Sequence, residues 1–262
     1  MEPLYVLTWH QAMGIHDAIE EYPFNAFVTK KKPVVVSPPA NQAPPVAPSV
    51  VVPIKSPVTA VLEAKKLAQE SQTLDALRHA VQEFKGLAIT RTATNTVFAD
   101  GNPDSDIMFI GEAPGADEDR QGIPFCGQSG QLLSQILGCV GLIREKNYYI
   151  TNSLFWRPPG NRKPTPEELA VCKPFVEKHI ALIKPKLIVL VGATAVSAVL
   201  DKTLSITKIR GQFLDYTNPY LTAPIPAMPI FHPSYLLRAP GQKRYAWQDA
   251  LKIKLWIEEQ AG

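Results

Sequence analysis

The stretch that decides the fold covers residues 106–133 and reads DIMFIGEAPGADEDRQGIPFCGQSGQLL. It opens with an apolar run, Ile107–Ile110, that is typical of a buried parallel strand. A turn rich in glycine and proline follows and carries three carboxylates, Asp117, Glu118 and Asp119. Apolar residues at helical spacing close the stretch. A strand, a carboxylate-bearing loop and a helix in this order put polar side chains at the carboxyl end of a sheet, where open α/β sheets bind ligands.

Three later segments have the pattern of short buried strands: residues 147–154, Leu187–Val191 and Pro229–His232. Strands that alternate with helices over short connections predict a three-layer α/β/α fold, with a central, mainly parallel, four-stranded sheet. Apolar spacing predicts helices at residues 58–84 (broken near Thr73, a candidate cap), 131–140, 166–183, 195–200 and 245–259. We expect a hairpin or loop at residues 205–213, and a loop after the fourth strand.

Composition limits the remaining organisation of the 262-residue chain. Residues 1–29 contain an amphipathic helical pattern without an identified partner, residues 30–57 form a proline-rich linker, and residues 58–262 form one domain. The net charge of +3 is small, so any DNA-binding face must be local. Three cysteines without a paired framework, no secretory leader and no apolar run of bilayer length predict a cytoplasmic protein that does not contact a membrane.

All four predicted strands end in polar residues, namely the 112–119 loop, Asn152, Thr194 and His232. The carboxyl ends of parallel strands share one edge of a sheet, so these groups should converge on one crevice. Asn152 can pair with an imide edge, Phe125 can stack on a ring, and His232 can donate to an oxygen that gains negative charge. Each residue alone is more typical of a turn, a core or a surface. Their joint placement favours recognition of a planar heterocycle.

The motifs GEAPGADED and GIPFCGQSGQLL resemble the first motif of the uracil-DNA glycosylase superfamily, closest to family four. TNSLFWRPPGNRKPTPEE resembles the second motif, and FHPSYLLRAP resembles the terminal histidine motif. The similarity extends over about residues 84–254. It implies a glycosylase fold and a monomeric DNA-repair enzyme that flips uracil out of DNA and hydrolyses its N-glycosidic bond, leaving an abasic site.

The resemblance also implies residue roles. Ala113 stands where the wider superfamily often has a water-handling aspartate, and the family-four pattern assigns that role to Glu118, with Asp119 as a weaker candidate. The implied catalytic residues are Glu118, His232 and Asn152, and the implied base pocket comprises Gly111, Glu112, Ala113, Phe125 and Asn152. The implied DNA contacts are Ser129, Lys208, Arg210, Ser234, Leu236, Leu237 and Arg238, with Leu236 as the leading wedge that replaces the flipped base.

Family-four enzymes usually hold an iron–sulfur cluster on four cysteines. The matching positions here are Phe84, Leu87, Trp156 and Cys172, so three thiolates are missing. We therefore expect no cluster and no other cofactor or metal, with apolar packing of these side chains in its place.

Two alternatives remain open. One is a protein that binds uracil-DNA without turning it over, because the identity of the catalytic carboxylate is inferred from the resemblance alone. Covalent trapping of the sugar by a loop histidine is disfavoured because residues 157–166 contain none. A nucleoside or nucleotide hydrolase is the other, although a free nucleoside needs no wedge such as Leu236 and Leu237.

Overall fold

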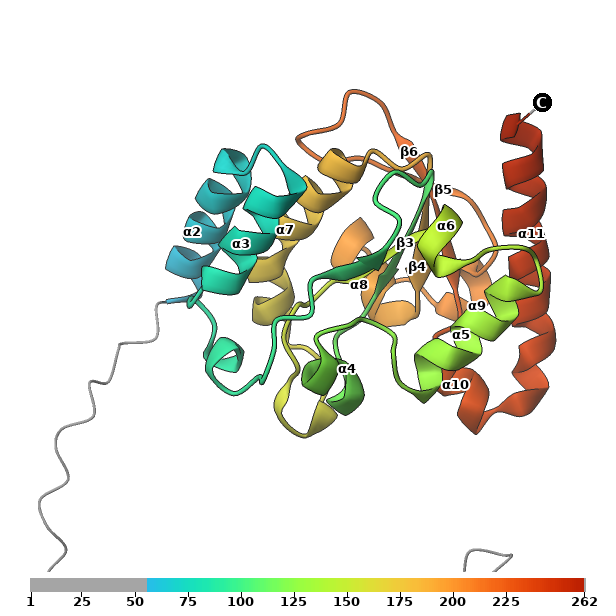
Figure 1. Ribbon diagram of the computed structural model, residues 1–262, viewed down its shortest axis with the longest axis horizontal. Coiled ribbons are helices and arrows are strands. Elements are labelled where there is room, and N and C mark those ends of the chain that lie inside the picture. The colour runs from blue at the N-terminus through green and yellow to red at the C-terminus, as the bar shows by residue number, and fades with distance from the viewer. Residues whose placement is uncertain (1–55, 262) are drawn as a thin grey trace, which may run out of the picture. The chain divides into compact units, whose positions relative to one another are not determined.

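The computed structural model of the protein describes residues 56–261, which form a six-stranded sheet enclosed by helices (Figure 1). The order of strands across the sheet is β1-β3-β2-β4-β6-β5. The four inner strands are mutually parallel, and the two edge strands pair antiparallel to their neighbours. The strands are β1 (Ala99–Gly101), β2 (Ile107–Gly111), β3 (Tyr149–Asn152), β4 (Leu187–Val191), β5 (Leu214–Tyr216) and β6 (Ile225–Ile230). The predicted fold class is confirmed, with two short edge strands added to the four predicted ones.

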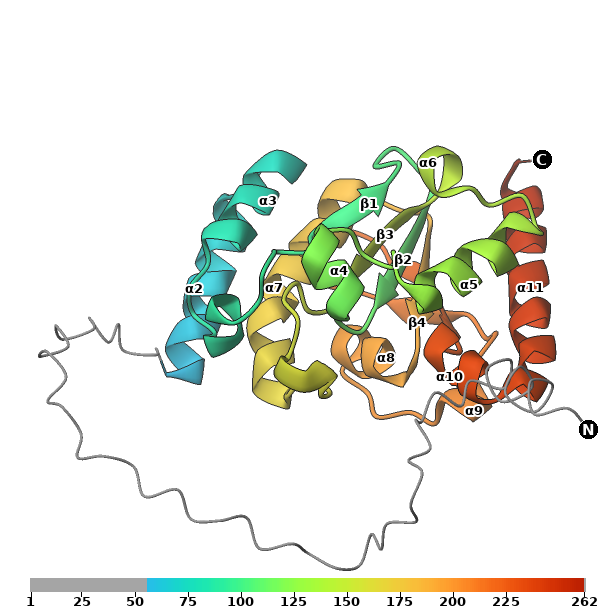
Figure 2. The same ribbon diagram turned by 60° about the horizontal axis from the view of Figure 1, so that its bottom comes forward.

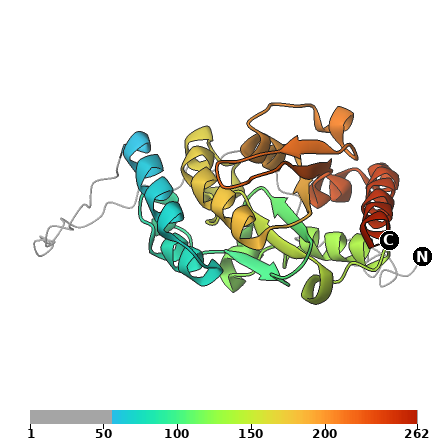
Figure 3. The ribbon, with the colours of Figure 1, turned by 90° about the horizontal axis from the view of Figure 1, so that it is seen from above.

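Alternate residues of each inner strand face opposite layers of helices, so most residues of these strands are apolar. Met108 and Ile110 of β2 belong to the core beneath one layer of helices, and Ile107 and Phe109 belong to the core beneath the other. Helices α7 and α8 cover the first face, with α2 and α3 packed against α7, and α5 and α11 cover the second face. Figure 3 shows α2 (blue) and α7 (gold) on one side of the strands and α11 (red) on the other.

The helices begin where local capping signals place them. Thr73 caps α3 by accepting the backbone N–H of Ala76 through its hydroxyl, and Thr165 and Glu168 form a capping box at α7. The α-helices are α2 (Pro57–Glu70), α3 (Leu74–Glu83), α4 (Ala116–Gln121), α5 (Gln128–Gly138), α6 (Arg144–Asn147), α7 (Pro166–Ile183), α8 (Ala193–Leu200), α9 (Ile206–Ile209), α10 (Pro233–Arg238) and α11 (Lys243–Ala261). Short 3-10 helices lie at Ala88–Arg91, Pro159–Asn161 and Pro240–Gln242.

Several segments differ from the sequence-based expectation. Residues 233–238 form helix α10 rather than a loop, and residues 206–209 form helix α9 within the expected hairpin or loop. The fourth parallel strand is Ile225–Ile230 and ends two residues before His232, which caps α10 instead. The predicted N-terminal appendage and nearly all of the linker lie outside the described residues. Within residues 56–261, no helix combines the length and the apolar character needed to cross a membrane.

The register of the parallel strands aligns their carboxyl ends at one edge of the sheet. Gly111 of β2 lies opposite Asn152 of β3, and Val191 of β4 lies opposite Ile230 of β6. The segments that leave these ends lead into α4, α8 and α10, which Figure 2 shows around the lower ends of the strands. Residues far apart in the sequence therefore meet at one edge.

Candidate functional site

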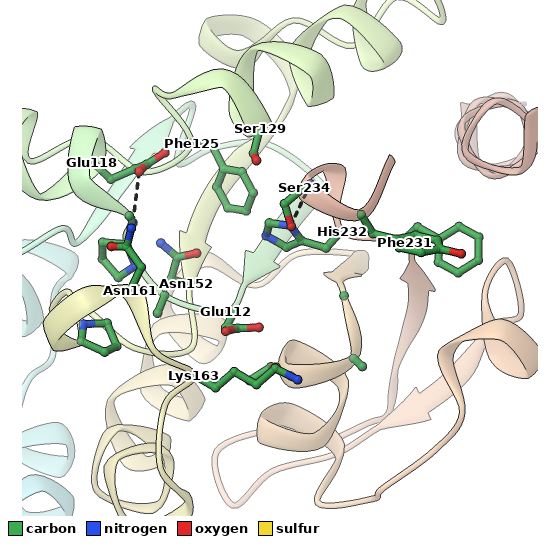
Figure 4. A pocket seen from close by; sticks show the side chains of 18 of the residues that line it. Glu112, Glu118, Phe125, Ser129, Asn152, Asn161, Lys163, Phe231, His232 and Ser234 are labelled. Carbon is green, nitrogen blue, oxygen red and sulfur yellow. Dashed lines mark hydrogen bonds between the residues drawn. The ribbon is translucent and has the colours of Figure 1, made fainter. Parts of the chain in front are cut away.

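A cavity of about 710 Å³ lies at the carboxyl edge of the parallel strands (Figure 4). It collects side chains from all four predicted strand ends, including Glu112, Asn152, Thr194 and His232. Its lining residues are Glu112, Ala113, Pro114, Gly115, Glu118, Phe125, Ser129, Asn152, Pro158, Asn161, Arg162, Lys163, Gly192, Ala193, Thr194, Ile206, Thr207, Phe231, His232, Ser234, Tyr235 and Arg238.

The floor of the cavity is built around Gly111, the last residue of β2. A methyl group on Gly111 would overlap both the ring of Phe125 and the Oδ1 atom of Asn152. Glycine at this position lets an aromatic ring and an amide approach the same strand end. The floor therefore offers one flat apolar surface and one hydrogen-bonding group side by side.

Asn152 presents an unpaired amide to this floor. The residue is only 2% exposed, and its side chain has no hydrogen-bond partner within residues 56–261. The amide faces the cavity, so water or a ligand can reach its donor and its acceptor. An amide that lines a cavity without a protein partner is suited to a ligand that carries a complementary donor and acceptor.

Phe125 has an uncommon backbone conformation. Its φ of +53° lies in the left-handed region, which for a bulky residue costs about 1–3 kcal/mol. The ring is 6.1 Å from the ring of His232, at an interplanar angle of 33°. Gly130 of α5 touches the Phe125 backbone so closely that any side chain there would overlap it. The surrounding structure thus holds the ring as a fixed wall of the cavity.

His232 is fixed in a single tautomer by the start of α10. Its Nδ1 accepts the backbone N–H of Ser234 at 3.1 Å and lies 2.8 Å from the Ser234 hydroxyl. An Nδ1 that accepts from a backbone N–H carries no proton, so the neutral ring has its proton on Nε2. Burial lowers the pKa of His232, against an opposing effect of Glu112, so the ring is neutral at pH 7. The ring is therefore a neutral Nε2–H donor.

The three candidate carboxylates have different surroundings. Glu118 accepts the backbone N–H groups of Gly115 and Gly127, each at 3.1 Å, one with each oxygen. Asp119 is buried away from the cavity and accepts two backbone N–H groups of the loop before β1. Glu112 lines the cavity, and no hydrogen bond reaches its carboxylate from residues 56–261. Glu112 and Glu118 both line the cavity, and of these two carboxylates that of Glu112 accepts no hydrogen bond from residues 56–261, whereas each oxygen of Glu118 keeps one free lone pair.

Helix α10 buries the side chain of Leu236 and exposes that of Leu237. Leu236 is 1% exposed and packs with Leu132, Phe231 and Ala246, whereas Leu237 is 42% exposed. The sequence-based ranking put Leu236 first as the wedge, but its side chain is part of the core. Leu237 is the one that faces solvent, beside Arg238 at the cavity rim.

Of the other predicted DNA contacts, four are accessible and one is engaged within the protein. Ser129, Ser234 and Arg238 line the cavity, and Lys208 is exposed on α9. Arg210 instead donates from Nε to Asp249 at 2.9 Å and stacks over the rings of Phe231 and Tyr245. The guanidinium of Arg210 holds α11 in place through Asp249, whereas the sequence predicts that it contacts a DNA phosphate.

Sequence reasoning overlooked several lining residues, namely Asn161, Ile206, Thr207, Phe231 and Tyr235. Asn161 follows the PPG turn with a φ of +55°, and asparagine tolerates that conformation. The PPGN string was the available signal for this turn. The others come from α9, from α10 and from the residue after β6, whose boundaries were not predicted.

A family model described as the "Uracil DNA glycosylase superfamily" matches residues 98–255, more than half of the chain. The chain therefore belongs to the uracil-DNA glycosylase superfamily. Within this superfamily it is similar to family four, as its motifs predict.

Three relatives define this similarity. The Type-4 uracil-DNA glycosylase of Thermotoga maritima is 44% identical over 170 residues, which cover 64% of this chain and 85% of the relative. The Type-4 uracil-DNA glycosylase of Sulfurisphaera tokodaii is 34% identical over 186 residues, covering 70% of this chain and 84% of the relative. That of Archaeoglobus fulgidus is also 34% identical over 186 residues, covering 70% and 92%.

The positions that match the cluster-binding cysteines form an apolar packing group. The ring of Phe84 lies 6.1 Å from that of Trp156 in a stacked arrangement and 5.3 Å from that of Phe175, edge to face. Cys172 is fully buried, and burial raises the pKa of its thiol far above its usual range. One protonated thiol among aromatic rings does not fit a cluster that needs a full set of thiolates. Within residues 56–261, no group of three or more His, Cys, Asp or Glu side chains could hold a metal ion.

Proposed function

We propose that this protein is a DNA-repair glycosylase that hydrolyses the N-glycosidic bond of uracil in DNA and leaves an abasic site. The observation that carries the proposal is the unpaired amide of Asn152, buried beside Phe125 at the floor of the cavity. The names of the three relatives, all Type-4 uracil-DNA glycosylases, give independent support. The partner is uracil-containing DNA.

Base recognition follows from the floor. Uracil has an imide N3–H between two carbonyl oxygens, and the Asn152 amide offers an acceptor and a donor that match N3–H and O4. Phe125 stacks on the ring. The cavity lies below the surface, so the nucleotide must leave the duplex stack before its base can reach Asn152.

Departure of the base is assisted by His232. As the glycosidic bond breaks, negative charge grows on the uracil carbonyl O2, and the Nε2–H of a neutral imidazole can donate to it. The bond from Ser234 to Nδ1 fixes the ring orientation before substrate arrives. The removal of one such donor commonly reduces kcat about 10²- to 10³-fold.

Water activation is assigned to Glu112. Its carboxylate lines the cavity without a protein partner, so it can orient water and offset positive charge on the sugar. Glu118, the acid that the family pattern favoured, accepts backbone N–H groups with both oxygens and is better suited to hold the two glycine turns. Glu112 thus takes the catalytic role predicted for Glu118.

DNA contacts surround the cavity mouth. We assign Leu237 to the gap left by the flipped base, because its side chain is exposed where that of Leu236 is not. Ser129, Lys208, Ser234 and Arg238 are the proposed contacts to the backbone phosphates. The enzyme would work without an iron–sulfur cluster, since the packed Phe84 and Trp156 occupy two of its positions.

The test is an assay of the purified full chain on a labelled duplex with one deoxyuridine, followed by alkali to cut abasic sites. A duplex with thymine at the same position is the substrate control, and iron is measured on the same sample. Lys186→Ala, at the amino end of the sheet, serves as a variant control for Asn152→Ala. Cleavage at uracil that Asn152→Ala abolishes supports the proposal. A specific complex without cleavage would indicate a uracil-DNA binding protein. The absence of both cleavage and a specific complex would overturn both functions.

A further inference from the structure

One side chain holds the backbone of Phe125 from outside the cavity. Arg144, the first residue of α6, donates from Nη1 to the carbonyl oxygen of Pro124 and from Nη2 to that of Phe125, both at 2.9 Å. Nη1 also donates to Asp100 of β1 at 3.0 Å. The Arg144 side chain is only 12% exposed, so water competes little for these bonds.

These contacts fix the backbone torsions of Phe125. The Pro124 carbonyl lies in the peptide plane before the Phe125 Cα, and the Phe125 carbonyl lies in the plane after it. Because one rigid, planar guanidinium holds both oxygens, the relative orientation of the two planes is set, and with it φ and ψ of Phe125. An aromatic residue at a φ of +53° needs such an external restraint.

We propose that Arg144, oriented by Asp100, is a positioning residue that keeps the Phe125 ring in its stacking orientation. The inference rests on the proposed function, in which Phe125 stacks on the base. Arg144 does not line the cavity of the site and would not touch the substrate. It acts only through the main chain of the Pro124–Phe125 turn.

Lysine cannot replace arginine here. A lysine ammonium is a single point on a flexible stem, so it can keep the ion pair with Asp100 but cannot hold two carbonyl oxygens in one plane. The positive charge would be preserved while the geometry is lost. The comparison of arginine with lysine therefore separates positioning from electrostatics.

The structure also provides a route for chemical rescue. A second open cavity of about 600 Å³ is lined by Asp100, Phe125, Arg144 and Tyr148, among others. Truncation of Arg144 would leave the guanidinium position accessible through this cavity. A free guanidinium ion has the same planar donors and can occupy that position.

The experiment compares Arg144→Ala, Arg144→Lys and Arg120→Ala with the wild type, using single-turnover cleavage of uracil-containing duplex with and without millimolar guanidinium. Arg120 is the matched control, because its side chain is 72% exposed and, among residues 56–261, pairs only with Asp117. We expect Arg144→Ala and Arg144→Lys to lose roughly 10- to 100-fold in cleavage rate. We expect guanidinium to restore much of the activity of Arg144→Ala and to leave the wild type and Arg120→Ala unchanged.

A double variant tests whether Arg144 acts through the ring. Once Phe125→Ala has removed the ring, adding Arg144→Ala should cause little further loss, because the two residues serve one function. Wild-type rates in Arg144→Lys, or a folded but slow Arg144→Ala that does not respond to guanidinium, would contradict the proposal. A wild type that is inactive on uracil-containing DNA would instead refute the proposed function, so the two failures are distinguishable.

Discussion

The backbone N–H of Ser234 donates to Nδ1 of His232 at 3.1 Å and thereby leaves Nε2 as the protonated nitrogen of the neutral ring. The Ser234 hydroxyl lies 2.8 Å from the same nitrogen, but the backbone contact alone is sufficient to set the tautomer. The orientation of the catalytic imidazole is thus a property of the first turn of α10. It does not depend on a particular side chain at position 234.

This relationship predicts unequal effects of two neighbouring substitutions. Ser234→Ala keeps the backbone donor and should change the single-turnover rate by no more than a few-fold when the enzyme is in excess, so that loss of the proposed phosphate contact of Ser234 does not limit binding. His232→Asn removes the Nε2–H donor and should slow the reaction about 10²- to 10³-fold. Rates measured on one uracil-containing oligonucleotide test both. A Ser234→Ala variant as slow as His232→Asn would mean that the hydroxyl, and not the backbone, controls the ring.

The two glutamates should separate catalysis from stability. Glu112→Gln removes a carboxylate that no hydrogen bond from residues 56–261 reaches, so we expect normal unfolding in urea and a rate reduced about 10²- to 10⁴-fold. Glu118→Gln replaces one acceptor oxygen with an NH₂ group that faces a backbone N–H. We expect this variant to lose about 1–3 kcal/mol of unfolding free energy. The reverse pattern, with Glu118→Gln stable and inactive, would restore the original assignment.

Substitutions of Leu236 and Leu237 should affect different properties, namely stability and cleavage of duplex DNA. Leu236→Ala empties a packed position and should cost about 2–5 kcal/mol of unfolding free energy. Leu237→Ala should leave stability within about 0.5 kcal/mol, since surface substitutions away from special features have small effects. It should reduce cleavage of uracil in duplex more than in single strands, where no stacked gap has to be filled. Equal losses on both substrates would exclude Leu237 as the wedge.

His179 of α7 predicts an acid sensitivity that is separate from catalysis. It is fully buried, its Nε2 lies 3.0 Å from the Tyr149 hydroxyl, and burial lowers its pKa to about 3. Between pH 6.5 and pH 3, the unfolded state binds a proton that the folded state does not, so the unfolding free energy falls as the pH falls. From pH 7.5 to pH 5 this loss should be about 2 kcal/mol.

Urea unfolding at the two pH values measures this effect. His179→Phe should remove most of the pH dependence, because phenylalanine keeps the stacking on Phe98 without a titrating group. His79→Gln, which alters an exposed histidine, should behave as the wild type does. A His179→Phe variant with unchanged acid sensitivity would assign the effect to other groups, such as His232, whose pKa burial also lowers.

The parts of the fold that could be predicted are those encoded locally. The apolar runs of β2 and β4 and the Thr73 cap of α3 each depend on a short stretch of sequence, and all three predictions are confirmed. Edge strands β1 and β5 have three residues each, too few for a periodic pattern. The sequence predicts a loop at helix α10, because prolines also lie before and after this segment and mask the helix-start signal of Pro233 after the cap residue His232.

The site was predictable as a set of strand ends but not in its side-chain partners. Arg210 binds Asp249, 39 positions later, and no local pattern reveals that pairing. Leu236 and Leu237 are adjacent and chemically identical, so only the rotation of α10 distinguishes the buried side chain from the exposed one. Glu118 likewise is committed to Gly127 through a contact between two turns.

The bridge that Glu118 makes between Gly115 and Gly127 determines when the cavity walls become ordered. The turns at Gly115 and Gly127 are joined by the carboxylate of Glu118 when the chain folds. Their loss of conformational entropy therefore belongs to folding, and the encounter with DNA does not have to supply it. The main free-energy cost of recognition is then the unstacking of the base from the DNA. Bases that are already poorly stacked should therefore be captured most readily.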